Sequence, residues 1–237
     1  MPTFLANLRG KVEFTVLLAA IIIAGGLWGF VELMEVARDA APHGFDTQIL
    51  LAFRTPGDPS TPIGPFWMED VMRDITSLGG GAILVAIVTV TIIYLLITRR
   101  IATALFVFVA ITGGQALNGL LKLGIDRPRP ELVSHLVNVH TLSFPSSHAM
   151  MSAVTFLTLG TLLARRMTGR ATKIYVLFVA VLLTFLVGLS RIYLGVHWPS
   201  DVLAGWCAGS AWAMLCWLVG RWFLRQGTPE DAASGPA

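Results

Sequence analysis

The chain has 237 residues, of which 55% are hydrophobic and only 13% are charged, and its mean hydropathy is +0.72. Because an average soluble protein carries roughly 25% charged residues, this composition excludes an ordinary soluble domain and indicates an integral membrane protein. The net charge of +3 is not gathered into a basic stripe or tail, so no nucleic-acid partner is indicated.

Charge-free apolar runs recur along the chain at the length that a membrane helix needs. A spanning helix takes about 20 residues, within a range of roughly 17 to 25. There are six such runs, the shortest of which borrow flanking residues: 14–31, 81–98, 101–121, 149–164, 174–189 and 202–220. The predicted fold class is therefore all-α, an integral membrane bundle of six transmembrane helices. We expect one domain over residues 1–226 and a disordered tail over residues 227–237.

The basic residues predict how the bundle is oriented. Ten of the seventeen Lys and Arg residues lie near the N-terminus, in the turn at Arg99 and Arg100, in the loop 165–173 and at the C-terminal end. Loops rich in Lys and Arg face the cytoplasm in multi-span proteins. Both termini are therefore predicted to be cytoplasmic, and the opposite ends of the spans are predicted to face the outer side of the cytoplasmic (inner) membrane.

The first outer segment, residues 32–80, contains a second kind of pattern. Its stretch FWMEDVMRDITSL, residues 66–78, places apolar residues at helical spacing opposite Glu69, Asp70, Arg73 and Asp74. This pattern predicts an amphipathic helix on the outer leaflet. Its role stays open between ordinary packing on the ends of the spans and admission of a lipid. In the third span, Gly113, Gly114 and Gly119 would let a neighbouring helix approach closely.

Polar and charged residues gather at span ends that face the same side. In an alternating six-span chain, the end of span three, the start of span four, the end of span five and the start of span six share one membrane surface. The residues predicted to converge there are Lys122, Arg129, Ser146, His148, Arg191, His197 and Asp201.

This set suits a phosphate-like dianion. The cations supply charge and forked donors for phosphate oxygens, and the start of span four adds free backbone N–H groups. Two histidines permit one to attack phosphorus while the other protonates the departing oxygen. Asp201 follows His197 by four residues, where it can accept the imidazole N–H. A zinc site needs three or four converging ligands, so no metal or other cofactor is predicted for a cluster dominated by cations.

Three sequence blocks carry a family resemblance. Lys122 with Arg129 and Pro130 fits K-x6-R-P, residues 145–148 read PSSH against P-S-G-H, and Ser190-Arg191 through His197 to Asp201 fits S-R-x5-H-x3-D. In this order the blocks resemble those of the type-2 phosphatidic acid phosphatases, a family of integral membrane lipid phosphatases.

The resemblance implies a role for each motif residue. His197 is implied as the nucleophile that becomes phosphohistidine, Asp201 as the residue that orients it, and His148 as the general acid. The implied phosphate ligands are Lys122, Arg129, Arg191, Ser146 and Ser190, with no metal.

Two further residues beside these motifs need an interpretation. Ser147 stands where the family has glycine, so its position tolerates a Cβ and is not expected to need a positive φ. Its backbone N–H remains a candidate phosphate donor. Arg127 has two possible roles, reaching a second phosphate or pairing with its neighbour Asp126.

The expected substrate is a phosphate on a lipid headgroup at the outer membrane surface. Phosphatidic acid, phosphatidylglycerol phosphate, a polyprenyl diphosphate and a phosphorylated lipid A all fit, and the choice between monophosphate and diphosphate stays open. One alternative is a phosphotransferase that uses the same histidine. An anion transporter is disfavoured, because transport sites usually lie near the bilayer midplane and these charges lie at span ends. The expected partners are the lipid phosphate and the bilayer, and the oligomeric state is left unassigned.

Overall fold

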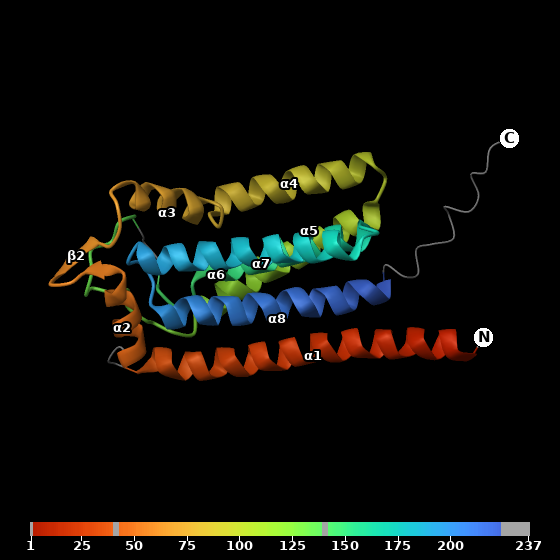
Figure 1. Ribbon diagram of the computed structural model, residues 1–237, viewed down its shortest axis with the longest axis horizontal. Coiled ribbons are helices and arrows are strands. Elements are labelled where there is room, and N and C mark those ends of the chain that lie inside the picture. Colours follow the sequence, from red (N-terminus) through yellow and green to blue (C-terminus); the bar gives the residue numbers. More distant parts are fainter. Residues whose placement is uncertain (1, 40–42, 139–141, 224–237) are drawn as a thin grey trace.

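The computed structural model of the protein describes residues 2–39, 43–138 and 142–223, and most of these residues are helical (Figure 1). A short antiparallel hairpin is formed by β1 (Arg54–Thr55) and β2 (Asp58–Pro62). The helices are α1 (Pro2–Arg38), α2 (Gly44–Ala52), α3 (Trp67–Ser77), α4 (Gly81–Ile97), α5 (Ile101–Lys122), α6 (Ser147–Arg166), α7 (Arg170–Tyr193) and α8 (Pro199–Phe223).

The predicted all-α membrane bundle is confirmed. Five of the described helices, α1, α5, α6, α7 and α8, are each long and apolar enough to cross a membrane. The sixth span is α4, which meets that test together with α3 across a bend of 45°. The amphipathic helix expected at 66–78 is therefore present as α3, and it packs against α7. The hairpin and α2 add a cap that the sequence did not predict.

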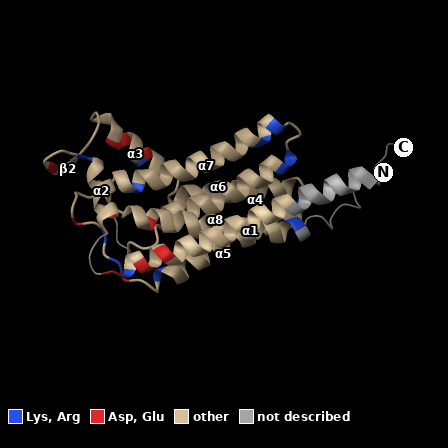
Figure 2. Ribbon diagram, turned by 60° about the horizontal axis from the view of Figure 1, so that its bottom comes forward, with Lys and Arg blue, Asp and Glu red and all other residues tan. Residues whose placement is uncertain are grey.

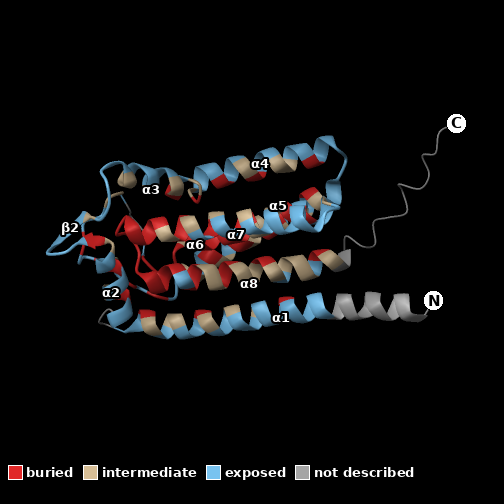
Figure 3. Ribbon diagram, in the orientation of Figure 1, coloured by how far each residue is buried: buried red, intermediate tan, exposed pale blue. Residues whose placement is uncertain are grey.

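Helix α6 lies at the centre of the bundle and α1 at its edge. Of the most apolar stretch of each helix, 61% is buried in α6 and 6% in α1. Helix α6 packs against α5, α7 and α8, whereas α1 packs mainly along α8 (Figure 3). The faces of α1 and α4 that are exposed in Figure 3 are the apolar surfaces that lipid would cover.

Close helix contacts depend on glycine. A Cβ at Gly209 of α8 would lie 2.6 Å from the carbonyl oxygen of Met150, and one at Gly205 would lie 2.8 Å from that of Ser146. These contacts bring the start of α8 against the start of α6. The expectation for α5 is confirmed at two of its three glycines. Gly113 and Gly114 contact neighbouring helices, whereas Gly119 has nothing within 4 Å of its would-be Cβ.

The two ends of the bundle differ in chemistry. The turns α4–α5 and α6–α7 lie at one end with Arg99, Arg100, Arg165 and Arg166, and the cap lies at the other (Figures 1 and 2). The end of α5, the start of α6, the end of α7 and the start of α8 all meet at the cap end, as the alternating topology predicted. The predicted tail 227–237 lies outside the described residues, so the domain limits stay a prediction.

Candidate active site

His197 lies in the short connection between α7 and α8, and both of its ring nitrogens have partners. Nδ1 lies 3.4 Å from Asp201 Oδ2, and Nε2 lies 3.2 Å from Arg129 Nη1. The same Arg129 nitrogen donates to the carbonyl oxygen of Val196 at 2.5 Å. Because a guanidinium only donates, Nε2 must accept, so the ring proton sits on Nδ1 and is donated to Asp201. This tautomer leaves the lone pair of Nε2 as the nucleophilic position.

Burial favours the neutral form of this ring. His197 is buried, and desolvation lowers its pKa to about 4 despite the opposing effect of Asp201. At neutral pH the imidazole is therefore uncharged, which is the form that can attack phosphorus.

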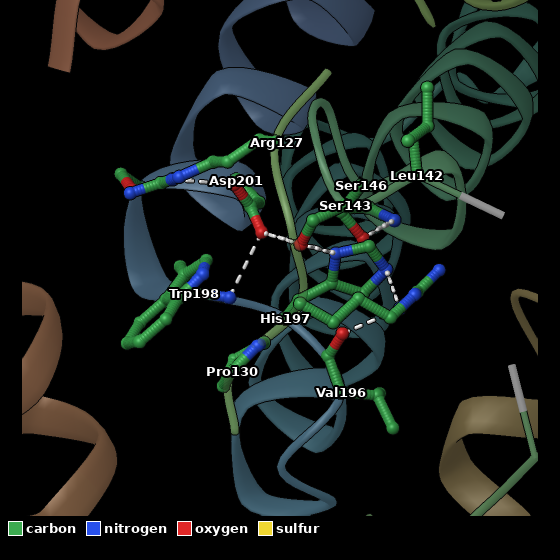
Figure 4. A network of polar contacts seen from close by, with 12 residues as sticks. Arg127, Pro130, Leu142, Ser143, Ser146, Val196, His197, Trp198 and Asp201 are labelled. Atoms are coloured by element: carbon green, nitrogen blue, oxygen red, sulfur yellow. Dashed lines mark hydrogen bonds and ion pairs between the residues drawn. The ribbon is translucent and has the colours of Figure 1, made fainter. Parts of the chain in front are cut away.

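Asp201, in the first turn of α8, is fixed from several sides. Its Oδ1 accepts from Arg127 Nη1 at 2.7 Å. Its Oδ2 accepts from the Trp198 N–H at 3.0 Å and from the hydroxyl of Ser143 (Figure 4). The N-terminus of α8 also favours a negative charge at this position. The carboxylate is therefore held in place independently of its contact with His197.

Arg127 pairs with two distant carboxylates and not with Asp126, as one of its two suggested roles required, and contact with a second phosphate stays a prediction. Its Nη2 donates to Asp46 Oδ2 at 2.9 Å while Nη1 binds Asp201, and its guanidinium lies 5.6 Å from the centre of the Trp198 ring. Its neighbour Asp126 is exposed. Asp46 comes from α2 in the cap, so two carboxylates distant in sequence replace the adjacent one. Removing one partner of such a buried pair would leave an uncompensated charge, which is costly.

Three cations meet beside His197 from three different segments. Lys122 ends α5 and donates from Nζ to the carbonyl oxygen of Leu142 at 2.9 Å. Arg191, in the last turn of α7, donates from Nη1 to Thr76 Oγ1 at 3.0 Å, and its Nε is buried with no hydrogen-bond partner. The charges of Lys122, Arg129 and Arg191 interact with one another. In the described part of the chain, neither Lys122 nor Arg191 forms an ion pair with a carboxylate. The surroundings of His197 therefore hold cations that no described carboxylate neutralises, and such a local positive charge attracts an anion.

The start of α6 completes the arrangement. Ser146 caps the helix: its Oγ accepts from the Ala149 N–H at 3.5 Å, and its own N–H donates to the carbonyl oxygen of Asp201 at 3.1 Å. The first N–H groups of a helix lack partners within it and favour an anion. His148 follows in the first turn, near enough to interact electrostatically with Arg191, His197, Arg129 and Lys122.

The two remaining motif serines are engaged with the protein. The hydroxyl of Ser147 accepts from Asn118 Nδ2 at 3.1 Å. Among the described non-glycine residues only Arg99 has a positive φ, so the expectation that Ser147 needs none is confirmed. The buried Ser190 donates its hydroxyl to the carbonyl oxygen of Val187 at 2.7 Å, inside its own helix. Its role as a phosphate ligand stays a prediction.

Sequence reasoning missed several residues that support the site: Asp46, Thr76, Asn118, Ser143 and Ser200. Ser143 lies two residues before Pro145, and Ser200 directly precedes Asp201, so closeness to the motifs was a usable signal for these two. Asp46 lies in α2 of the cap and Thr76 lies in α3, and neither gave such a signal. Over the described ranges, no group of three or more His, Cys, Asp or Glu residues is arranged to hold a metal ion.

A membrane-spanning bundle with histidines and uncompensated cations at one end defines a membrane-embedded phosphatase. The chain belongs to the PAP2 superfamily, whose match covers residues 102–225.

Individual relatives agree with this assignment. Phosphatidylglycerophosphatase B of Bacillus subtilis is 32% identical over 144 residues, which are 60% of this chain and 70% of that protein. A decaprenylphosphoryl-5-phosphoribose phosphatase of Mycobacterium tuberculosis is 40% identical over 99 residues, 40% of this chain and 49% of that protein. The crystal structure of a transmembrane PAP2 type phosphatidylglycerolphosphate phosphatase from Bacillus subtilis superimposes with a TM-score of 0.75 at 26% identity, covering 89% of this chain and 99% of that one.

Proposed function

We propose that this protein hydrolyses a phosphate monoester or diphosphate on a lipid headgroup at the outer face of the cytoplasmic membrane. The observation that carries the proposal is the ring of His197, whose unprotonated Nε2 faces Arg129 while Asp201 accepts the hydrogen bond of the Nδ1–H. Such a ring is prepared for nucleophilic attack. Its position at the end of a membrane bundle suits a substrate whose phosphate reaches the water while its tails stay in lipid.

The reaction would take two displacements. First, Nε2 of His197 attacks phosphorus, the P–O bond to the lipid breaks, and its electron pair leaves with the lipid oxygen. His148 gives that oxygen its proton. Second, His148 takes a proton from water, the water oxygen attacks the phosphohistidine, and the P–N bond breaks. Phosphate leaves and His197 returns to its neutral form, so atoms and charges balance.

The cations would stabilise the charge that develops during both steps. The transferred phosphoryl group spreads negative charge over its three equatorial oxygens. Lys122, Arg129 and Arg191 supply donors from three directions, and the N–H groups of Ser147 and His148 supply two more. Such preorganised donors usually contribute the largest single part of the rate enhancement.

The relatives support the substrate class and the basic residues support the orientation. Phosphatidylglycerophosphatase B and decaprenylphosphoryl-5-phosphoribose phosphatase are both named for lipid-linked phosphates. The arginine-rich turns at the end away from the cap favour a cytoplasmic position for that end and for both termini. The site then opens to the periplasmic or extracellular side.

Phosphate release by the purified protein in mixed micelles tests the proposal. The substrates are phosphatidylglycerol phosphate, phosphatidic acid and a polyprenyl diphosphate, each with excess chelator. His197→Ala is compared with the control His43→Ala, because the His43 side chain is 42% exposed and, among the described residues, its ring hydrogen-bonds to Asp39. We expect release from at least one lipid by the wild type and by His43→Ala, and none by His197→Ala.

Three outcomes would contradict parts of this scheme. Turnover of His197→Ala at near wild-type rate would remove His197 as nucleophile. Loss of activity on chelation would mean that a metal takes part. Labelled lipid alcohol gaining phosphate without free phosphate appearing would indicate a phosphotransferase.

A further inference from the structure

A buried chain of charges links the cap to the carboxylate beside His197. It runs from Asp46 of α2 through Arg127 to Asp201 of α8, with Arg127 Nη2 at 2.9 Å from one carboxylate and Nη1 at 2.7 Å from the other. Asp46 and Asp201 are fully buried and Arg127 is 5% exposed. A cap element that could have served packing alone thus reaches the centre of the site.

Ser200 closes this chain into a network. Its N–H donates to Asp46 Oδ1 at 2.8 Å and its hydroxyl donates to Asp46 Oδ2 at 2.6 Å. The same hydroxyl accepts from Arg127 Nη1 at 2.6 Å. Asp46 therefore holds the start of α8 and the guanidinium at once, in a network whose members are all paired.

The geometry decides which oxygen of Asp201 is available to His197. Arg127 occupies Oδ1, so Oδ2 is the oxygen that meets Nδ1 of the imidazole (Figure 4). If Asp201 rotated, Arg127 would lose a buried charged partner, and breaking such a pair is costly. The rotamer of Asp201 is thereby fixed by Arg127, which is fixed in turn by Asp46.

Charge balance gives Asp46 a second effect. Two carboxylates share one guanidinium, so the group keeps one net negative charge next to the imidazole. Without the charge of Asp46, the positive charge of Arg127 would be compensated by Asp201 alone. Asp201 would then stabilise less well the positive charge that the ring acquires during attack.

We propose that Asp46 and Arg127 are positioning residues for the nucleophile: through Asp201 they set the tautomer, orientation and electrostatic environment of His197, and so couple helix α2 of the cap to catalysis. This rests on the proposed function of His197. Neither residue contacts the reacting atoms. The guanidinium of Arg127 binds its two carboxylate partners instead of serving as a phosphate ligand.

Asp46→Asn tests the proposal, because it keeps the shape of the side chain and removes its charge. The matched control is Asp126→Asn, an exposed carboxylate next to Arg127 in sequence. We expect kcat of Asp46→Asn to fall about 10- to 100-fold, by analogy with the loss of residues that orient metal-ligating side chains, with KM within about twofold. The rate of phosphohistidine formation should fall by the same factor. The control should match the wild type.

Ser200→Ala tests the same network if Asp46→Asn folds poorly, and a double variant tests the coupling between Asp46 and Arg127. Ser200→Ala removes one uncharged hydroxyl of the network and should lower kcat about three- to tenfold, again at constant KM. In an Arg127→Gln background, adding Asp46→Asn should lower kcat by less than about threefold, because Asp46 acts through Arg127. Full additive losses, or losses in KM instead of kcat, would overturn the proposal.

A spectroscopic measurement separates this proposal from the proposed function. The Nδ1–H proton of His197 should give a downfield proton NMR signal that is absent in His197→Ala and shifted upfield in Asp46→Asn. If no lipid is hydrolysed but this signal responds as expected, the proposed function fails and the positioning network stands. If hydrolysis is normal and the Nδ1–H signal has the same position in Asp46→Asn as in the wild type, the network plays no positioning role.

Discussion

Replacing Asp201 with asparagine tests how far the chemistry depends on the tautomer of His197. An amide has one accepting oxygen and one donating nitrogen, whereas Asp201 accepts with both oxygens. The charged donor Arg127 Nη1, at 2.7 Å, takes the amide oxygen, because charge-assisted hydrogen bonds are the stronger ones. The amide NH2 group then faces the N–H of Trp198 and Nδ1 of His197.

That orientation forces the imidazole into the wrong form. Nδ1 must accept from the amide, so the ring proton moves to Nε2, which breaks the hydrogen bond from Arg129 and removes the lone pair that would attack phosphorus. Where a histidine is held in the wrong tautomer, the rate falls by about 10⁴. The cations stay in place, so we expect kcat to fall about 10³- to 10⁴-fold at nearly unchanged KM. His197→Ala, which removes the attacking atom, should lose more.

The assay follows formation of the covalent phosphate after rapid mixing with a labelled lipid phosphate in micelles. Acid-labile, alkali-stable label identifies phosphohistidine, and steady-state turnover is measured alongside. Asp74→Asn, an exposed carboxylate of α3, controls for an amide substitution elsewhere. A folded Asp201→Asn within tenfold of wild type would refute the tautomer argument. A loss equal to that of His197→Ala would show that Asp201 does more than orient the ring.

Three further predictions concern protonation, binding and packing. NMR titration of labelled histidine should place the pKa of His197 at about 4, below the usual value of about 6.5. As the pH falls, the unfolded state then binds a proton before the folded state does. The contribution of the neutral ring to stability is therefore complete above pH 6.5 and is lost as the pH falls toward 4. A measured pKa near 6.5 would contradict the burial of the ring. Arg191→Lys keeps the charge but loses the planar guanidinium, whose Nη1 donates to Thr76. KM in steady-state assays should therefore rise about tenfold, and an unchanged KM would exclude a binding role. Gly209→Val places a Cβ 2.6 Å from the Met150 carbonyl oxygen and should lower the unfolding free energy by about 1–3 kcal/mol in micelle denaturation. Gly25→Val, with nothing within 4 Å, should be neutral, and equal effects of the two would contradict the packing argument.

The sequence predicted those parts of the fold that depend on one-dimensional patterns. Charge-free runs define the spans because the bilayer sets their length, and alternation then assigns His148 and His197 to the same end. Spacing predicted the contact between His197 and Asp201, since residues four apart at a helix start lie close together. The motif residues needed no knowledge of tertiary packing.

The cap could not be predicted in the same way. Asp46 looks like one of several acidic residues in a proline-rich outer segment, and only tertiary structure buries it against Ser200. Arg127 had an obvious neighbour in Asp126, and local pairing is a fair guess for an exposed loop. The structure contradicts that pairing: the guanidinium of Arg127 is buried and must be paired where it lies, and there it meets Asp46 and Asp201 while Asp126 is exposed. The sequence patterns therefore could not show which charged residues become buried by contacts between segments distant in the chain.

The departure at Ser147 shows how such non-local contacts protect a site. A glycine at this position could serve a positive φ or a close backbone approach, yet Ser147 is the first residue of an ordinary helix and its hydroxyl accepts from Asn118. Asn118 precedes Lys122 by four residues on α5, so the two side chains share one face of that helix. The hydroxyl therefore links the start of α6 to the face of α5 that presents Lys122 to the site. The added Cβ thus comes with a hydrogen bond that ties the start of α6, which we propose to bind the phosphate, to the face of the preceding helix that carries Lys122.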